Sequence, residues 1–244
     1  MPITKKSYFL SEINNLIIKD NYINNISSIF INAGEVLTSF SSPGGNPRGI
    51  AINSSGNLIS GDNSTNTIYV HDGISSTTTN SFSTPGTGPT GLAIDSNGNL
   101  ISGDNATDKI YVHQGISGTI TTSFNSPSGF PSGIAIDPNG NLISCDNSTD
   151  KIYVHDGISS SILTSFDSPG GTPTRLTIDS NDNLISCDAG TDMIYVHQGI
   201  SSTITRSFDS PGTNPFGLTI DPNGDLIVID RNNINNYKFY IVKL

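Results

Sequence analysis

Four histidines and six aspartates are the residues of this chain whose types and spacing could bind a metal ion or support acid–base catalysis. The histidines each end a short apolar run and recur every 42 residues, at His71, His113, His155 and His197. The aspartates follow a second apolar run with the same spacing, at Asp20, Asp62, Asp104, Asp146, Asp188 and Asp230. This constant phase indicates a role played in every copy of a repeat, because a catalytic site requires an asymmetric cluster of different groups.

The spacing of the histidines argues against a shared metal ion. Equivalent positions on neighbouring packed sheets lie about 10 Å or more apart, whereas zinc binds its ligating nitrogen atoms at about 2 Å. We therefore interpret the four histidines as partly exposed residues at strand ends.

The six aspartates each precede a loop. There, a carboxylate accepts hydrogen bonds from nearby backbone N–H groups and stabilises the turn. We assign them this structural role, and we place Asp108, Asp150 and Asp192 of the same loops in solvent. Residues 179–183 are similar to a calcium loop but lack its downstream glutamate. The sequence predicts neither a metal nor another cofactor.

Cys145 and Cys187 share one phase of the repeat, where two other copies have glycine. A disulfide requires Cα atoms within about 7 Å, which two copies of one position do not provide. We expect two small, buried, free thiols.

The positions that break the repeat are better candidates for a ligand site. A loop with a constant proline precedes one apolar run in every copy, and the residues beside that proline vary. Variable loops on a rigid scaffold commonly carry binding function. Four aromatic or cationic residues of these loops could converge at one mouth of a central channel: Arg48, Phe130, Arg175 and Phe216. Sequence drift at exposed loop tips is the competing explanation.

A repeat spanning most of the chain must position these residues. Ser-Phe pairs begin at Ser39, Ser81, Ser123, Ser165 and Ser207, and a Gly-Ile-Ala-Ile run or a relative of it follows each pair. Within residues 91–124, four short apolar runs alternate with turns, including an Asn-Gly pair that suits a hairpin. Four antiparallel strands per unit are typical of a propeller blade.

The sequence predicts an all-β fold, a six-bladed β-propeller of four-stranded antiparallel blades with about 42 residues each. Five copies are plain, and we obtain a sixth by aligning residues 8–31 with the pattern. The whole chain, residues 1–244, would form one domain. Its last copy lacks a fourth strand, and we expect residues 2–6 to fill that edge. The alternative is a three-stranded last blade with an open edge.

The repeat resembles a known family. The string Pro47-Arg-Gly-Ile-Ala-Ile-Asn53, followed by Ser55-Gly-Asn-Leu58 and Ile68-Tyr-Val70, is similar to the NHL-repeat consensus. This resemblance implies a six-bladed propeller. It implies little about activity, because NHL-like propellers include protein-binding and RNA-binding modules, and related rings include lactonases and lyases. The chain departs from the consensus at Ser60, Ser102, Ser144, Ser186, Lys109 and Lys151.

Composition limits the partners. Eleven basic and 21 acidic side chains give a formal charge of −10, which opposes binding to nucleic acid and to anionic membranes. No apolar run approaches the roughly 20 residues of a membrane helix, and no signal peptide is apparent. We expect a monomer, located in the cytoplasm if the chain is complete.

The function favoured by these patterns is a non-catalytic binding scaffold that presents variable loops around the channel mouth to a protein, peptide or glycan. Two alternatives remain: a propeller enzyme of the lactonase or lyase kind, and a recently amplified or engineered repeat protein with no evolved ligand. The chain has only two glutamates, Glu12 and Glu35, which argues against the carboxylate-rich metal site of a lactonase.

Overall fold

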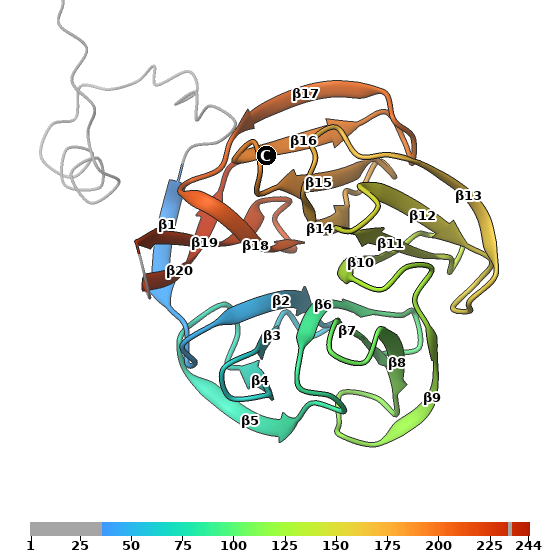
Figure 1. Cartoon of the computed structure of the whole chain (residues 1–244). Coiled ribbons are helices and arrows are strands. Elements are labelled where there is room, and N and C mark those ends of the chain that lie inside the picture. The colour runs from blue at the N-terminus through green and yellow to red at the C-terminus, as the bar shows by residue number, and fades with distance from the viewer. Residues whose placement is uncertain (1–35, 234–235) are drawn as a thin grey trace, which may run out of the picture. The chain divides into compact units, whose positions relative to one another are not determined.

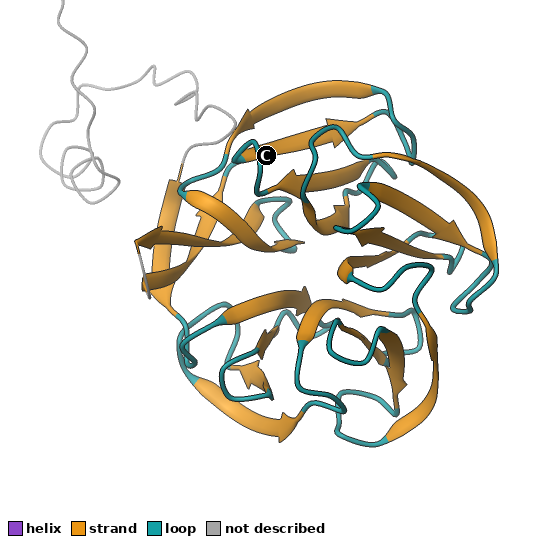
Figure 2. Ribbon diagram, in the orientation of Figure 1, coloured by secondary structure: helices purple, strands orange, loops and turns teal. Residues whose placement is uncertain are grey.

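The computed structural model describes residues 36–233 and 236–244 of the chain (Figure 1). The elements assigned in these residues are all β-strands. They form four-stranded antiparallel sheets arranged as blades around a central channel (Figure 2). In four of the sheets the strands follow chain order from the channel outward. This part of the chain contains no helix with the length and apolar character needed to cross a membrane.

The inner strands, which surround the channel, are β2 (Pro47–Ile52), β6 (Pro89–Ile94), β10 (Pro131–Ile136), β14 (Pro173–Ile178) and β18 (Thr213–Ile220). The second strands are β3 (Leu58–Asp62), β7 (Leu100–Asp104), β11 (Leu142–Asp146), β15 (Leu184–Asp188) and β19 (Leu226–Asn233). The third strands are β4 (Thr67–His71), β8 (Lys109–His113), β12 (Lys151–His155), β16 (Met193–His197) and β20 (Asn236–Val242). The outer strands are β1 (Val36–Ser41), β5 (Thr78–Ser83), β9 (Ile120–Asn125), β13 (Ile162–Asp167) and β17 (Ile204–Asp209).

Local sequence explains the tight turn between the first two strands of a blade. Gly98 has a φ angle of 80°, which glycine adopts without strain, and its N–H donates to the carbonyl oxygen of Asp95. The Asp95 carboxylate accepts hydrogen bonds from the N–H groups of Asn97 and Asn99. The Asp-Ser-Asn-Gly-Asn sequence therefore supplies both the positive φ angle and the hydrogen bonds that the turn requires.

The hydrophobic core lies between the blades. Ile101 and Ile110 of one blade pack with Ile134 and Leu142 of the next, and all four are almost completely buried. Burying a side chain of this size stabilises the fold by about 1.5–3 kcal/mol. The same cluster recurs at the other interfaces, so the blades are held together by apolar contact of one face with its neighbour.

The predicted number of blades was wrong: the ring has five, not six. The inner strands contact one another in the cyclic order β2, β6, β10, β14, β18 and back to β2. Because β18 packs directly against β2, the circle has no place for a sixth inner strand. Residues 8–31, which we had aligned as a further copy, lie outside the described residues.

The ring is closed by β1, which pairs antiparallel with β20 at the outer edge of the blade formed by β18, β19 and β20 (Figure 1). Phe40 of β1 stacks on Phe239 with ring centroids 4.9 Å apart. The edge that we had expected residues 2–6 to fill is therefore occupied by Val36–Ser41. Residues 1–6, and with them part of the predicted domain 1–244, lie outside the described residues.

A uniform blade of about 42 consecutive residues is also wrong as a description of the whole ring. The closing blade combines β18, β19 and β20, the last three strands of the chain, with β1, which precedes β2 in the sequence. Its β18 and β19 each have eight residues, longer than their counterparts in the other sheets.

Candidate functional site

A small pocket at one mouth of the channel contains all four residues that the loop pattern singled out. Its volume is about 100 Å³. Arg48, Phe130, Arg175 and Phe216 line it, although they come from four different blades. We call it the mouth pocket. Its remaining lining residues are Asn63, Thr90, Asn105, Ser132, Asn147 and Thr174.

Irregular pairing at the start of each inner strand brings side chains to this mouth. The ladder between β10 and β11 shifts register between Pro131 and Gly133, which leaves Ser132 as an extra residue. Register also shifts at the same place in the other four inner strands. Such bulges re-aim side chains. The residues in this phase are Arg48, Thr90, Ser132, Thr174 and Phe216, and all five line the pocket.

Arg175 forms the floor of the mouth pocket. It occupies the position that is glycine in the other four inner strands, and its side chain is only 4% exposed. Its Nε donates a hydrogen bond of 2.8 Å to the carbonyl oxygen of Arg48 on β2, across the ring. Its Nη1 donates to the carbonyl oxygens of Ser132 and Thr174. These bonds to three inner strands place Arg175 across the channel axis, so the pocket is closed below.

The glycines at the positions equivalent to Arg175 allow neighbouring inner strands to approach one another closely. A Cβ atom on Gly49 would lie 2.1 Å from the carbonyl oxygen of Thr90, and one on Gly91 would lie 2.6 Å from the backbone nitrogen of Ile134. Real Cβ atoms do not make such contacts, so side chains are excluded from this layer in these blades. The layer is therefore free for the one long side chain, that of Arg175.

Arg48 and Phe130 form the wall and rim. The Arg48 guanidinium lies over the Phe216 ring, 4.2 Å from its centroid. A cation over an aromatic face is stabilised by about 0.5–2 kcal/mol. Phe130 remains 40% exposed, an unusual exposure for a large aromatic side chain.

The turn aspartates hold the loops that carry these residues. Asp146 accepts a hydrogen bond of 2.9 Å from the backbone N–H of Phe130, and its other oxygen accepts from the N–H groups of Ser148 and Thr149. Burial opposes ionisation of Asp146, but hydrogen bonds led by the Ser148 hydroxyl outweigh it and lower the pKa of the carboxyl group. Asp62, Asp104, Asp188 and Asp230 likewise accept from a backbone N–H of the loop entering the inner strand. Asp20 lies outside the described residues.

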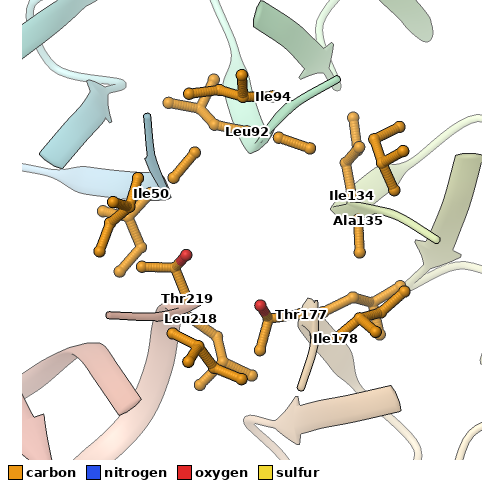
Figure 3. Close-up of a pocket in the computed structure, with 15 residues that line it drawn as sticks. Ile50, Leu92, Ile94, Ile134, Ala135, Thr177, Ile178, Leu218 and Thr219 are labelled. Carbon is orange, nitrogen blue, oxygen red and sulfur yellow. The ribbon is translucent and has the colours of Figure 1, made fainter. Parts of the chain in front are cut away.

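Below Arg175 the channel is lined mainly by apolar side chains (Figure 3). This cavity has a volume of about 210 Å³. Alanine faces it from three inner strands, whereas Thr177 and Thr219 occupy the same phase in β14 and β18 and turn their hydroxyl groups toward the open centre. These two hydroxyl groups are the polar side-chain atoms that the described strands present to the cavity.

The histidines lie away from the mouth pocket, and our expectation that they are partly exposed was wrong. All four are completely buried. The Nε2 of His155 lies 2.8 Å from the Ser144 hydroxyl, and its Nδ1 lies 2.6 Å from the carbonyl oxygen of Ser159. His71, His113 and His197 make the equivalent contacts. Desolvation by burial lowers the pKa of each histidine, more than the hydrogen bond to the carbonyl raises it.

Cys145 and Cys187 are free and buried, as predicted. Cys145 Sγ lies 3.2 Å from the Ser132 hydroxyl, and Cys187 Sγ lies 3.3 Å from the Thr174 hydroxyl. Burial raises the pKa of Cys145 to about 11 and that of Cys187 to about 12. Neither thiol is ionised near neutral pH, so neither is a nucleophile there.

Sequence reasoning missed the polar part of the mouth pocket. The hydroxyl residues share the phase of Arg48 and Phe216, and each lining asparagine directly follows a turn aspartate: Asn63, Asn105 and Asn147. Phase alone could have found them, because a position that is cationic in one blade and aromatic in another faces the same place in all. We had followed only the aromatic and cationic substitutions.

Comparison with known proteins supports the fold alone. No family model matches the chain, and no curated protein matches it in sequence. Its structure is similar to glutaminyl cyclase from Myxococcus xanthus, with a TM-score of 0.70 and 12% identity over 86% of this chain and 95% of that one.

Two other propellers are less similar. A catalytically inactive virginiamycin B lyase from Staphylococcus aureus, solved with quinupristin, gives a TM-score of 0.52 and 22% identity over 79% of this chain and 66% of that one. The WD40 β-propeller domain of Doa1 gives a TM-score of 0.56 and 15% identity over 80% of this chain and 62% of that one. The chain thus spans slightly less than two thirds of both. The described residues form a β-propeller, and membership of the NHL family stays a prediction.

Proposed function

We propose that the chain is a non-catalytic binding module whose ligand, a protein or peptide segment or a glycan, docks at the mouth pocket. The observation that supports this most directly is the convergence of four repeat-breaking residues at one place. Loops of this phase reach the axis in every blade, and there the chain combines two guanidinium groups with two aromatic rings, which are groups that binding sites use. The exposed ring of Phe130 offers the apolar surface that binding sites use as an anchor.

The chemistry of the lining residues favours binding over catalysis. The mouth pocket contains guanidinium, amide, hydroxyl and phenyl groups, of which none is a general base near neutral pH. The imidazole groups of the described blades are buried and already hydrogen-bonded. An enzyme of the lactonase or lyase kind would need an acid–base group at the mouth or in the channel. For these reasons we place the binding function ahead of it.

The acidic balance of the chain, with a net charge of −10, supports a partner that is neither nucleic acid nor an anionic membrane. We also propose that the module acts as a monomer, because its five blades complete their own ring. A repeat protein with no evolved ligand is the competing interpretation.

Binding at the mouth pocket can be tested with random peptides and an array of glycans, both probed with the full chain. We expect ligands retained by the unmodified protein to bind at least tenfold more weakly to Phe130→Ala and Phe216→Ala. Leu163→Ala is the matched control, because Leu163 is 58% exposed on β13, in an outer strand. Ligands that bind all four proteins equally would place any site elsewhere, and no ligand in either collection would contradict the proposed function.

A further inference from the structure

Arg175 brings a buried positive charge to the mouth pocket. No aspartate or glutamate is among the described residues that line the pocket beside it. Desolvation by burial, and then repulsion by Arg48, lower the pKa of Arg175 to about 10, which still leaves it charged at neutral pH. A buried cation without a counter-ion is costly. Carbonyl oxygens satisfy part of its hydrogen bonding but supply no net negative charge.

Two donors in the pocket are available to an anion. Arg175 uses Nε and Nη1 for backbone carbonyl groups, whereas its Nη2 has no hydrogen-bond acceptor in the described part of the chain. The Thr90 hydroxyl is 4% exposed and makes no hydrogen bond to the described residues. Its counterparts Ser132 and Thr174 donate to the carbonyl oxygens of Pro173 and Pro215. A carboxylate has two acceptor oxygens, one for each of these donors.

The dimensions of the pocket suit the end of a chain. Its volume of about 100 Å³ accommodates a carboxylate with few further atoms, and Arg175 closes it below. A ligand must therefore enter and leave by the same opening. Asn63, Asn105 and Asn147 stand around the pocket with amide groups that pair with peptide N–H and C=O groups, and Phe130 offers an apolar surface to a neighbouring side chain.

We propose that the mouth pocket binds the free C-terminal carboxylate of a peptide, with Arg175, Arg48 and the Thr90 hydroxyl as its anion-binding groups. This proposal rests on the proposed binding function and names the ligand chemistry of that site. Guanidinium groups pair with carboxylates through charge-assisted hydrogen bonds, and capture of a terminal carboxylate is a recurring mode of peptide recognition. A single terminal charge also suits a protein whose net charge is −10, because an acidic peptide would be repelled as a whole.

The test compares three pools of N-acetylated random pentapeptides captured on the immobilised full chain. The first pool lacks Asp and Glu and has free C-termini, so the terminal carboxylate is its only acid. The second has the same composition with amidated C-termini. The third is amidated and has one internal Asp, which distinguishes a side-chain carboxylate from a terminal one. Captured peptides are counted by mass spectrometry for the unmodified protein and for Arg48→Gln, Arg175→Lys, Phe130→Ala and Leu163→Ala, each with its melting temperature.

We expect at least tenfold more capture from the first pool than from either amidated pool, and loss of that excess in Arg48→Gln but not in Leu163→Ala. Arg175→Lys should also lose it; if that variant unfolds, Arg48→Gln alone carries the result. Equal capture from the free and amidated pools, with loss in Phe130→Ala, would overturn the carboxylate assignment and leave the binding function intact. A preference for the third pool, or capture by the glycan array only, would also overturn it.

Discussion

In four blades a buried histidine makes two hydrogen bonds, and desolvation by burial favours its neutral form by lowering its pKa. A carbonyl oxygen only accepts, so the Nδ1 of His155 donates to Ser159, and in the neutral ring Nε2 then accepts from the Ser144 hydroxyl. The ring also packs against Phe124 of the preceding blade at a centroid distance of 6.3 Å. These residues, which could form a catalytic dyad by type alone, instead connect neighbouring strands within the core.

Acid should destabilise the propeller through these histidines. Their pKa values are lowered in the folded state, so the unfolded chain binds protons first as the pH falls below about 6.5. The stabilisation is present above that pH and is lost as the pH falls toward the folded-state values. Each histidine contributes a slope approaching about 1.4 kcal/mol per pH unit. Urea unfolding at pH 7.5, 6.5, 5.5 and 5.0 measures how the free energy of unfolding changes with pH. The His155→Gln variant should show a shallower slope, and a flat profile for the unmodified protein would refute the assignment.

The turn aspartates connect stability with the shape of the mouth. Asp146→Asn replaces one accepting oxygen by an amide nitrogen that cannot accept from Phe130 or from Ser148. Hydrogen bonds to a charged group contribute about 1.5–3 kcal/mol, so we expect a loss of that size in the free energy of unfolding. Asp167→Asn is the control, because Asp167 is exposed and its carboxylate pairs, among the described residues, with the exposed Lys151, so this substitution should cost much less than Asp146→Asn. Chemical denaturation of both variants measures the two free energies of unfolding. Equal losses of this free energy would contradict the role of Asp146.

At the scale of elements, most of the strands followed from the sequence. The runs beginning at Gly91, Leu100, Lys109 and Thr119 match β6, β7, β8 and β9 closely, because alternating apolar residues and Asn-Gly turns are local signals. The strand that pairs with the first Ser-Phe pair could not be predicted from the sequence. Ser39 and Phe40 pair with Tyr240 and Phe239, about 200 residues away, and nothing in the local pattern reveals a partner at that distance.

The closing strand β1 should be essential for stability. Thr38→Pro places a proline, whose ring fixes φ and crowds the paired backbone, opposite Ile241 in the ladder, and Phe40→Ala removes the ring stacked on Phe239. We expect each to lower the free energy of unfolding by about 2–4 kcal/mol. Deletion of residues 1–6 is the comparison and should leave the melting temperature unchanged, because β1 already occupies the edge. A drop on that deletion, with no effect of Thr38→Pro, would reverse the assignment.

At the scale of the whole molecule, the number of blades depended on whether β1 completes the last blade or belongs to a blade of its own. Five Ser-Phe pairs and five runs of the Gly-Ile-Ala-Ile kind are present, and five blades use them all once β1 joins β20. We had assigned the first pair to a separate copy, which forced a sixth blade. The mouth pocket was easier to predict, because convergence of the loops requires only a ring and does not depend on the number of its blades.

Removing one period should therefore prevent ring closure. A chain without residues 84–125 keeps every remaining landmark in phase but has four inner strands, which cannot surround the same channel at the same packing distances. We expect an aggregated or oligomeric product without a cooperative thermal transition, measured by light scattering and calorimetry. A control deletion of residues 1–31 should remain monomeric and cooperative. A folded monomer from the shortened ring would show that the blades act independently, as in an open repeat stack.

The pairing of β1 with β20 also determines when folding can finish in the cell. During synthesis β1 leaves the ribosome first among the described strands and β20 leaves last. The intermediate blades can form one after another as they emerge, because each is continuous in the chain. Completion of the ring therefore waits until β20 has emerged, and β1 has no ladder partner before that point.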